Sequence, residues 1–392
     1  MRQEQPIPGT SLPQDKVITR EFIFLCATNF LFFMTVYSFL VTLPVYSVVL
    51  GGGEGQAGFV TAAMSAVTVL SLPYLGRLVD RFGRAPLMRL GLGVLLAEAL
   101  ALNFVSWLPL LVATSAFIGA AVASFQTGAT TLVADLAPVH RRGQAMGIFG
   151  TFTTTAVALS PAVATFVMRG IGFTALFAMS AVLAVSGLLL SLTVREPPRR
   201  AGTYTKGALL HPAGFLPGLC IFGVTVTYGA LISFLPGQAP QMGLENAGLF
   251  FTVFAFSTIL VRAVAGSVSD RVGRAPVILP ALFLVAAAMV LLGQSTGPAM
   301  ILAVGFMYGL GYGSAHPTVM ALAVDRGGPD ARASAVATFN VSYNLGLAAG
   351  SLAMGFLLAA TSFALMAAVA GAIPFLALAT LYVRRGPVTK PP

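Results

Sequence analysis

The chain has 392 residues, of which 57% are hydrophobic and 9% charged, and it carries a net charge of +10. Soluble domains carry about 25% charged residues, so water cannot be the solvent for most of this surface. A positive net charge alone would suit nucleic acid or anionic lipid as a partner. The charges lie in short polar breaks between long apolar runs. This excludes a nucleic-acid binder and indicates a polytopic membrane protein.

Apolar runs of about 20 residues, each long enough to cross roughly 30 Å of hydrocarbon as a helix, recur along the whole chain. We therefore expect an all-α integral membrane protein. The runs predict twelve membrane-spanning helices at 22–50, 57–79, 86–105, 108–134, 143–168, 173–194, 213–236, 245–268, 276–293, 298–324, 333–359 and 363–383.

The basic residues predict the topology. All but two of the 22 Lys and Arg residues lie at the termini or in every second segment between helices; the exceptions are Arg169 and Arg262. This is the positive-inside pattern, so both termini are expected in the cytoplasm. We expect Arg262 to extend to the cytoplasmic edge in a supporting role and Arg169 to be a surface residue on the outside.

An internal repeat predicts two similar halves. The segment from Gly76 to Pro86, GRLVDRFGRAP, matches GSVSDRVGRAP from Gly266 to Pro276 at an offset of 190 residues. The same offset places Asp135 on Asp325 and Arg142 on Arg332. Two six-helix bundles in the same orientation follow.

The polar stretches set the predicted domain boundaries. We expect a cytoplasmic N-terminal segment, an N-terminal bundle, a linker, a C-terminal bundle and a cytoplasmic tail. These occupy 1–21, 22–195, 196–212, 213–384 and 385–392. Cys26 and Cys220 lie far apart in apolar runs and are expected to be packing residues.

The repeated GxLxDRxGR motif resembles the loop motif of the major facilitator superfamily, and the resemblance covers the whole chain. It implies a charge cluster on the cytoplasmic side of each half that latches the outward-facing state. The alternative is that these charges follow topology or bind the lipid surface. The gate residues implied are Gly76, Asp80, Arg81, Gly83, Arg84, Asp135 and Arg142, and in the second half Gly266, Asp270, Arg271, Gly273, Arg274, Asp325 and Arg332.

Helix five resembles the pattern of the family's exporters. Ala156, Ser160, Pro161 and Ala164 form a degenerate version of that pattern in which only the proline is literal. Pro161 is expected to bend the helix, although ordinary small-residue packing explains the other positions equally well. Two features depart from the family: Ser115 stands where the fourth helix often has Arg, and the first helix lacks a carboxylate. Proton antiport through the usual residues is therefore not expected.

Two titratable residues inside predicted helices are candidates for coupling. Glu98 is the only acidic residue well inside a span, and a purely structural role is the alternative. His316 lies in a glycine-rich stretch, Tyr308 to Pro317, that predicts a hinge in the tenth helix. A satisfied core histidine is the alternative there.

The helices that line the cavity in this family offer aromatic and hydroxylic side chains with hardly any fixed charge. Such a cavity favours a neutral, amphipathic or mildly polar solute, although each residue alone also suits interhelical hydrogen bonding. The candidate substrate-cavity residues are Asn29, Tyr37, Gln126, Thr130, Thr227, Tyr228, Tyr308, Tyr312, His316, Asn340, Tyr343 and Asn344.

Catalytic, nucleotide-binding and metal-binding signatures are missing from the sequence, so we expect no enzyme, no cofactor and no metal. The expected function is secondary active transport by alternating access, as efflux of a drug or metabolite, with protons as a candidate coupling partner. The alternatives are a membrane sensor that binds without transport, and a uniporter or importer of a sugar-like or other small metabolite. We expect a monomer in contact with membrane lipids, in the bacterial cytoplasmic membrane.

Overall fold

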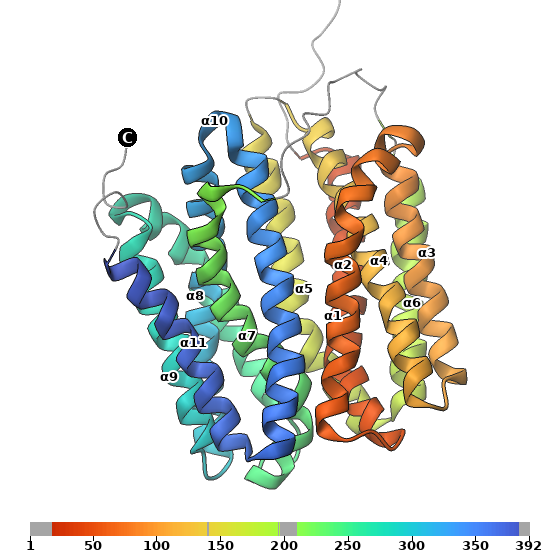
Figure 1. Ribbon diagram of the computed structural model, residues 1–392. Helices are drawn as coiled ribbons and strands as arrows, with labels where there is room; N and C mark the ends of the chain where they lie inside the picture. Colours follow the sequence, from red (N-terminus) through yellow and green to blue (C-terminus); the bar gives the residue numbers. More distant parts are fainter. Residues whose placement is uncertain (1–17, 139–140, 195, 197–209, 384–392) are drawn as a thin grey trace, which may run out of the picture.

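The computed structural model describes residues 18–138, 141–194, 196 and 210–383 (Figure 1). Within these residues the fold is entirely helical, as predicted. The helices of the first half are α1 (Arg20–Val49), α2 (Glu54–Phe82), α3 (Arg84–Ala101), α4 (Leu108–Leu136), α5 (Arg142–Gly170) and α6 (Phe173–Thr193), with a short 3₁₀ helix, η1, at Leu102–Phe104.

The second half repeats this order with one merged element. Its helices are η3 (Pro212–Gly214), α7 (Phe215–Gln238), η4 (Ala239–Met242), α8 (Gly248–Val272), α9 (Ala275–Gly293), α10 (Pro298–Ala360) and α11 (Phe363–Val383). The 63 residues of α10 contain a break at Gly328, where φ is 57° and ψ is −166°. A positive φ is accessible to glycine at little cost, so the chain turns there without a longer loop. The segment predicted between residues 324 and 333 is thus reduced to this break.

The helices match the predicted membrane spans. Within the described residues, ten are long and apolar enough to cross a membrane, and two shorter apolar helical stretches lie at Gly248–Arg262 and Phe363–Ala377. Together they account for the twelve predicted spans. In lipid every backbone polar group must be satisfied internally, and a helix does so within one segment.

The two halves stand side by side, with α1–α6 on one side and α7–α11 on the other (Figure 1). We call the end that carries Arg84 and Asp325 the linker end, since the segment joining the halves begins and finishes there. The opposite end, with Gly53 and Gly243, is the far end. In the first half α1 packs against α5 and α6; in the second α10 packs against α7, α8 and α9.

The halves meet in the middle of the molecule and at the far end. Phe59 of α2 and Phe356 of α10 pack edge to face with ring centroids 5.7 Å apart. Phe166 of α5 lies against the first turn of α8 at Gly248. Side-chain hydrogen bonds join the halves from Tyr37 to Tyr343, from Thr61 to Ser233, and from Arg169 to the Pro236 carbonyl.

We predict that Gly119→Val destabilises the protein, because a Cβ at Gly119 would lie about 3.0 Å from the backbone of Met64 and Thr68 in α2. Overpacking of this kind costs about 1–3 kcal/mol. Thermal unfolding in one detergent measures the effect. Gly93→Val is the matched control, because a Cβ at Gly93 meets nothing within 4 Å. Equal melting temperatures for the two variants would contradict the predicted α2–α4 contact.

Candidate functional site

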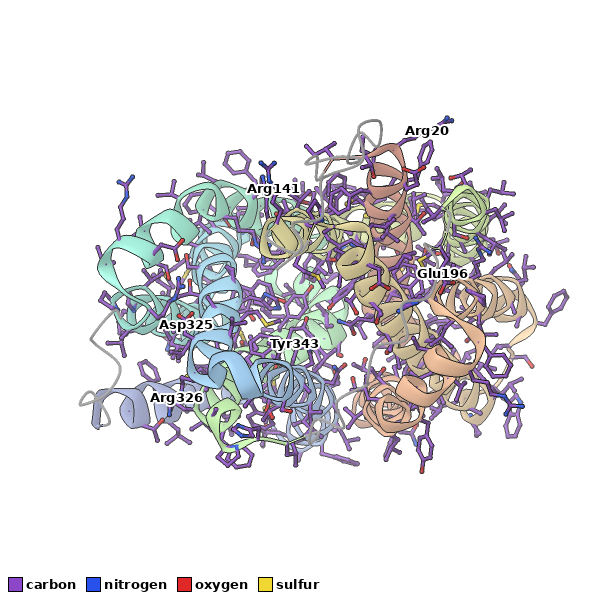
Figure 2. All side chains as sticks on the ribbon, turned by 90° about the horizontal axis from the view of Figure 1, so that it is seen from above. Arg20, Arg141, Glu196, Asp325, Arg326 and Tyr343 are labelled. Atoms are coloured by element: carbon purple, nitrogen blue, oxygen red, sulfur yellow. The ribbon has the colours of Figure 1, made fainter. Side chains whose placement is uncertain are left out.

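Five tyrosines from both halves gather where the halves meet. We call Tyr37 of α1, Tyr228 of α7, and Tyr308, Tyr312 and Tyr343 of α10 the tyrosine cluster. The Tyr343 hydroxyl lies 2.8 Å from that of Tyr37 and 3.3 Å from that of Tyr312. The Tyr228 and Tyr312 rings are 4.8 Å apart between centroids. Viewed from the linker end, Tyr343 lies between the halves at the centre of the molecule (Figure 2).

Helical spacing and close packing position the cluster. Tyr308 and Tyr312 are four residues apart, so they lie on the same face of α10. Each of these tyrosines is followed by a glycine, Gly309 or Gly313. A Cβ at Gly309 would lie 2.6 Å from the Phe254 carbonyl oxygen of α8. In this conformation α10 is helical through the stretch where a hinge is predicted, and these two glycines allow α8 to approach.

His316 lies one turn beyond Tyr312, toward the linker end. Its ring is 5.7 Å from that of Tyr343 and 5.6 Å from that of Phe339, both edge to face, and 6.2 Å from that of Tyr312. His316 therefore extends the tyrosine cluster as one aromatic wall. Thr227 closes the other side, with its hydroxyl 2.8 Å from that of Tyr308.

Other predicted cavity residues take different partners. The Asn29 amide donates to the Thr153 hydroxyl at 2.7 Å and to the Phe149 carbonyl at 3.4 Å, and the side chain is fully buried. In this conformation Asn29 therefore joins α1 to α5. The hydroxyl of Thr130 and the amide of Asn344 bond within their own helices, to the carbonyls of Gln126 and Asn340 respectively.

Arg262 is the residue that the sequence reading placed wrongly. Thr258 and Val261 of α8 pack on Gly313 of α10, and this register brings Arg262, in the next turn of α8, level with His316. The Nε and Nη2 atoms are buried and have no hydrogen-bond partner among the described residues. A fixed positive charge therefore lies at the edge of the aromatic wall, where hardly any was expected. The available signal was that Arg262 is the only basic residue inside the 245–268 span.

The first charge cluster joins α3, α4 and the start of the linker. Arg84 Nε lies 2.7 Å from Asp135 Oδ2, an ion pair that is not aligned as a hydrogen bond. The Glu196 carboxylate accepts from the backbone N–H groups of Arg84 and Ala85 at 3.1 and 3.3 Å. Glu196 thus caps the N-terminus of α3, where the helix dipole favours an anion. It was predicted only as a linker residue.

The second charge cluster is also built on an ion pair between an arginine and an aspartate. Arg274 lies 2.8 Å from Asp325 through Nε and 2.9 Å from the Ser269 hydroxyl through Nη1, and it also pairs with Asp270. Partial burial lowers the pKa of Arg274, but the bonds to Asp325 and Asp270 outweigh it, so the pKa is raised. The motif glycines Gly83 and Gly273 have φ of 100° and 93° and form the turns before α3 and α9. Both clusters are built within a single half.

Some predicted gate residues fall outside the description. Nothing is described of the side chains of Gly76, Asp80, Arg142, Gly266 and Arg332. Arg81 and Arg271 are exposed at the linker end. On opposite halves in Figure 2, Glu196 and Asp325 mark the two clusters.

The helix α5 continues through its internal proline. Pro161 lies inside α5, and the neighbouring Ser160 hydroxyl donates to the Met34 carbonyl of α1 at 2.6 Å. Ser38 of α1 lies 3.0 Å from the same hydroxyl. Ser160, one of the exporter-like positions, therefore joins α5 to α1 within the first half.

Glu98 and Ser115 lie away from the aromatic wall. Glu98 is 5% exposed on α3, beside Thr114 of α4, and α3 packs against α4 and α6. Ser115 is buried and donates to the Leu111 carbonyl at 2.6 Å. No group of three His, Cys, Asp or Glu side chains that could hold a metal occurs among the described residues.

The family model for the major facilitator superfamily matches residues 25–236 and 218–392. The chain belongs to this superfamily. The resemblance predicted from the loop motif is confirmed, and the protein is a membrane transporter rather than an enzyme.

Relatives and solved structures agree with this assignment. The multi-drug resistance efflux pump PmrA of Streptococcus pneumoniae is 26% identical over 349 residues, which cover 83% of this chain and 86% of the pump. Multidrug resistance protein 2 of Bacillus subtilis is 24% identical over 54% of this chain and 56% of its own. The crystal structure of the nucleoside transporter NupG superposes with a TM-score of 0.73 at 16% identity, covering 94% of this chain and 100% of that one. That likeness shows the fold alone.

We predict that Asp135→Asn destabilises the protein more than Asp325→Asn does. The Asp135 side chain is 27% exposed and that of Asp325 is 50% exposed, so water screens the second pair more. The expected losses are about 1–2 kcal/mol and under about 1 kcal/mol respectively. Thermal unfolding near neutral pH measures both losses.

Because the pKa of Arg274 is raised above the ordinary arginine value, its contribution to stability is lost only above the ordinary arginine range. A larger loss for Asp325→Asn than for Asp135→Asn would contradict this ranking.

Proposed function

We propose that the protein is a secondary active exporter of small amphipathic solutes, working by rocker-switch alternating access. The relative named as a multi-drug resistance efflux pump supports the direction, and it and multidrug resistance protein 2 support the class of solute. The aromatic wall supports the same class, because aromatic rings bind apolar bodies while the hydroxyls orient polar groups.

One observation carries the mechanism. The hydrogen bonds that join the halves lie at the centre and the far end, through Tyr37, Thr61 and Arg169, while each charge cluster stays within its own half. This is the arrangement expected of a transporter closed at one end. The predicted bundles 22–195 and 213–384 are the rigid bodies that rock about the central contact.

The orientation follows from the charges. Basic residues gather at the linker end, among them Arg81, Arg141 and Arg326, and the loops of the far end carry none. By the positive-inside rule the linker end and both termini are cytoplasmic. The conformation is then inward-facing, and the membrane is a bacterial cytoplasmic membrane.

The gate works indirectly in this proposal. Arg84 with Asp135, and Arg274 with Asp325, fix the linker-end geometry of each half rather than bond across to the other. The outward-facing state then forms when these two prearranged surfaces meet, with Asp80 as the latch between them. Glu196 ties the first surface to the linker that joins the halves.

The coupling ion is proposed to be the proton. Glu98 and His316 are the two candidate coupling residues, and of these His316 lies at the aromatic wall. The decisive test is substrate-induced pH change in sealed proteoliposomes with an imposed proton gradient, screened across amphipathic drugs, sugars and amino acids.

We expect drug flux that dissipates the gradient and is abolished by His316→Ala or by Glu98→Gln. Flux indifferent to the gradient and to both variants would point to facilitated diffusion or another ion. Absence of flux for every solute, with binding retained, would favour a sensor.

We predict that Arg169→Ala opens the far end, because Arg169 donates at 2.6 Å to the Pro236 carbonyl across the halves. Arg169 is exposed, so losing this bond should cost about 0.5–1 kcal/mol and shift the conformational equilibrium roughly two- to fivefold. Spin labels on Gly53→Cys and Gln241→Cys, with Cys26 and Cys220 replaced by Ala, measure the far-end distance. The exposed Arg20→Ala is the control. An unchanged distance distribution for Arg169→Ala would contradict the far-end lock.

A further inference from the structure

The interior of α8 carries a single charge, on Arg262. The other charged residues of this helix, Asp270 and Arg271, lie in its last turn at the linker end. At 1.5 Å per residue, Arg262 is about 12 Å along the helix from Asp270. A cation placed this deep between apolar helices is costly and is retained where it faces a cavity or a partner.

The register between α8 and α10 brings Arg262 to the aromatic wall. Phe254 lies against Gly309, and Thr258 and Val261 lie against Gly313, so the next turn of α8 faces His316. This register places the charge at the edge of the tyrosine cluster, in agreement with the electrostatic interaction of Arg262 with Tyr312, Tyr343 and His316.

Two nitrogens of the Arg262 guanidinium lack a hydrogen-bond acceptor in the part of the chain that the structure describes. These two atoms, Nε and Nη2, are buried, although the side chain keeps part of its surface accessible. The nearby carboxylates of Asp270 and Asp325 are bound to Arg274. A buried guanidinium left unpaired is strongly unfavourable, and a bound oxyanion would relieve it.

We propose that Arg262, with Tyr312 and Tyr343, is a binding subsite for the carboxylate of an amphipathic organic anion whose apolar body lies on the rings of the tyrosine cluster. This deepens the proposed function by naming the polar group of its solutes, and it rests on that function for the transport of the ligand. The planar guanidinium matches a carboxylate through paired N–H donors, and the two hydroxyls supply further donors. One fixed cation balances one negative charge, so a monoanion is the fitting ligand.

The test is a binding measurement that needs no transport. The full-length protein in nanodiscs of neutral lipid is dialysed to equilibrium against 2-naphthoate or its neutral analogue 2-naphthamide. We expect wild type to bind 2-naphthoate saturably and about tenfold or more tighter than 2-naphthamide. Arg262→Gln should abolish this preference. Arg262→Lys should keep part of it, because lysine keeps the positive charge but lacks the paired N–H donors of the guanidinium.

Two controls separate the subsite from general effects. Arg326→Gln removes an exposed cation from the same half and should leave both affinities within about twofold. Arg262→Met should raise the melting temperature of the ligand-free protein, because an apolar side chain replaces an unpaired buried charge. It should also remove the stabilisation by 2-naphthoate.

The outcomes are distinct from those of the flux assay. The subsite is overturned if wild type shows no saturable 2-naphthoate binding, if it binds both probes equally, or if Arg262→Gln keeps the preference. Drug flux together with any of these results would support the proposed export function and contradict the Arg262 subsite. An Arg262-dependent preference without flux of any solute would leave the subsite standing and overturn the exporter.

Discussion

The hydrocarbon interior admits almost no unpaired charge, and this constraint decides where every charged residue of the protein lies. Basic side chains collect at the linker end, where Arg84 and Arg274 find carboxylates within 2.8 Å. Inside the helices the polar groups are hydroxyls and amides, which satisfy themselves on the backbone of their own or a neighbouring helix. The exceptions are Arg262 and Glu98, and because such exceptions are costly they are the places to look for function.

The same constraint shapes the contact between the halves. A transporter must exchange two arrangements of packed helices, so bonds between its halves have to be few and weak enough to break. The bonds seen at the centre join hydroxyls, as between Tyr37 and Tyr343, and the far end adds the Arg169 contact. The strong ion pairs are kept inside each half. Rigid halves joined by weak bonds give a two-state element that a bound solute can bias.

The tyrosine cluster and Arg262 divide recognition between them. Aromatic rings bind many apolar bodies with little selectivity, which suits a transporter related to multidrug pumps. A single guanidinium adds a requirement for charge without restricting the shape of the rest of the molecule. The neutral cavity expected from composition and the charged edge found in the structure are thus two parts of one site.

The sequence by itself determined the membrane class, the helix positions, the two-fold repeat and the superfamily, because hydropathy and the GxLxDRxGR motif are local signals repeated in both halves. The resemblance to the superfamily also pointed to the tyrosines of α1, α7 and α10, because these are helices that line the cavity in that family. The tertiary structure alone decided that Asn29 packs on α5, that Glu196 caps α3, and that Arg262 turns toward His316 rather than the membrane edge. These depend on the rotation of one helix against another, which side-chain packing sets and a single chain's periodicity cannot.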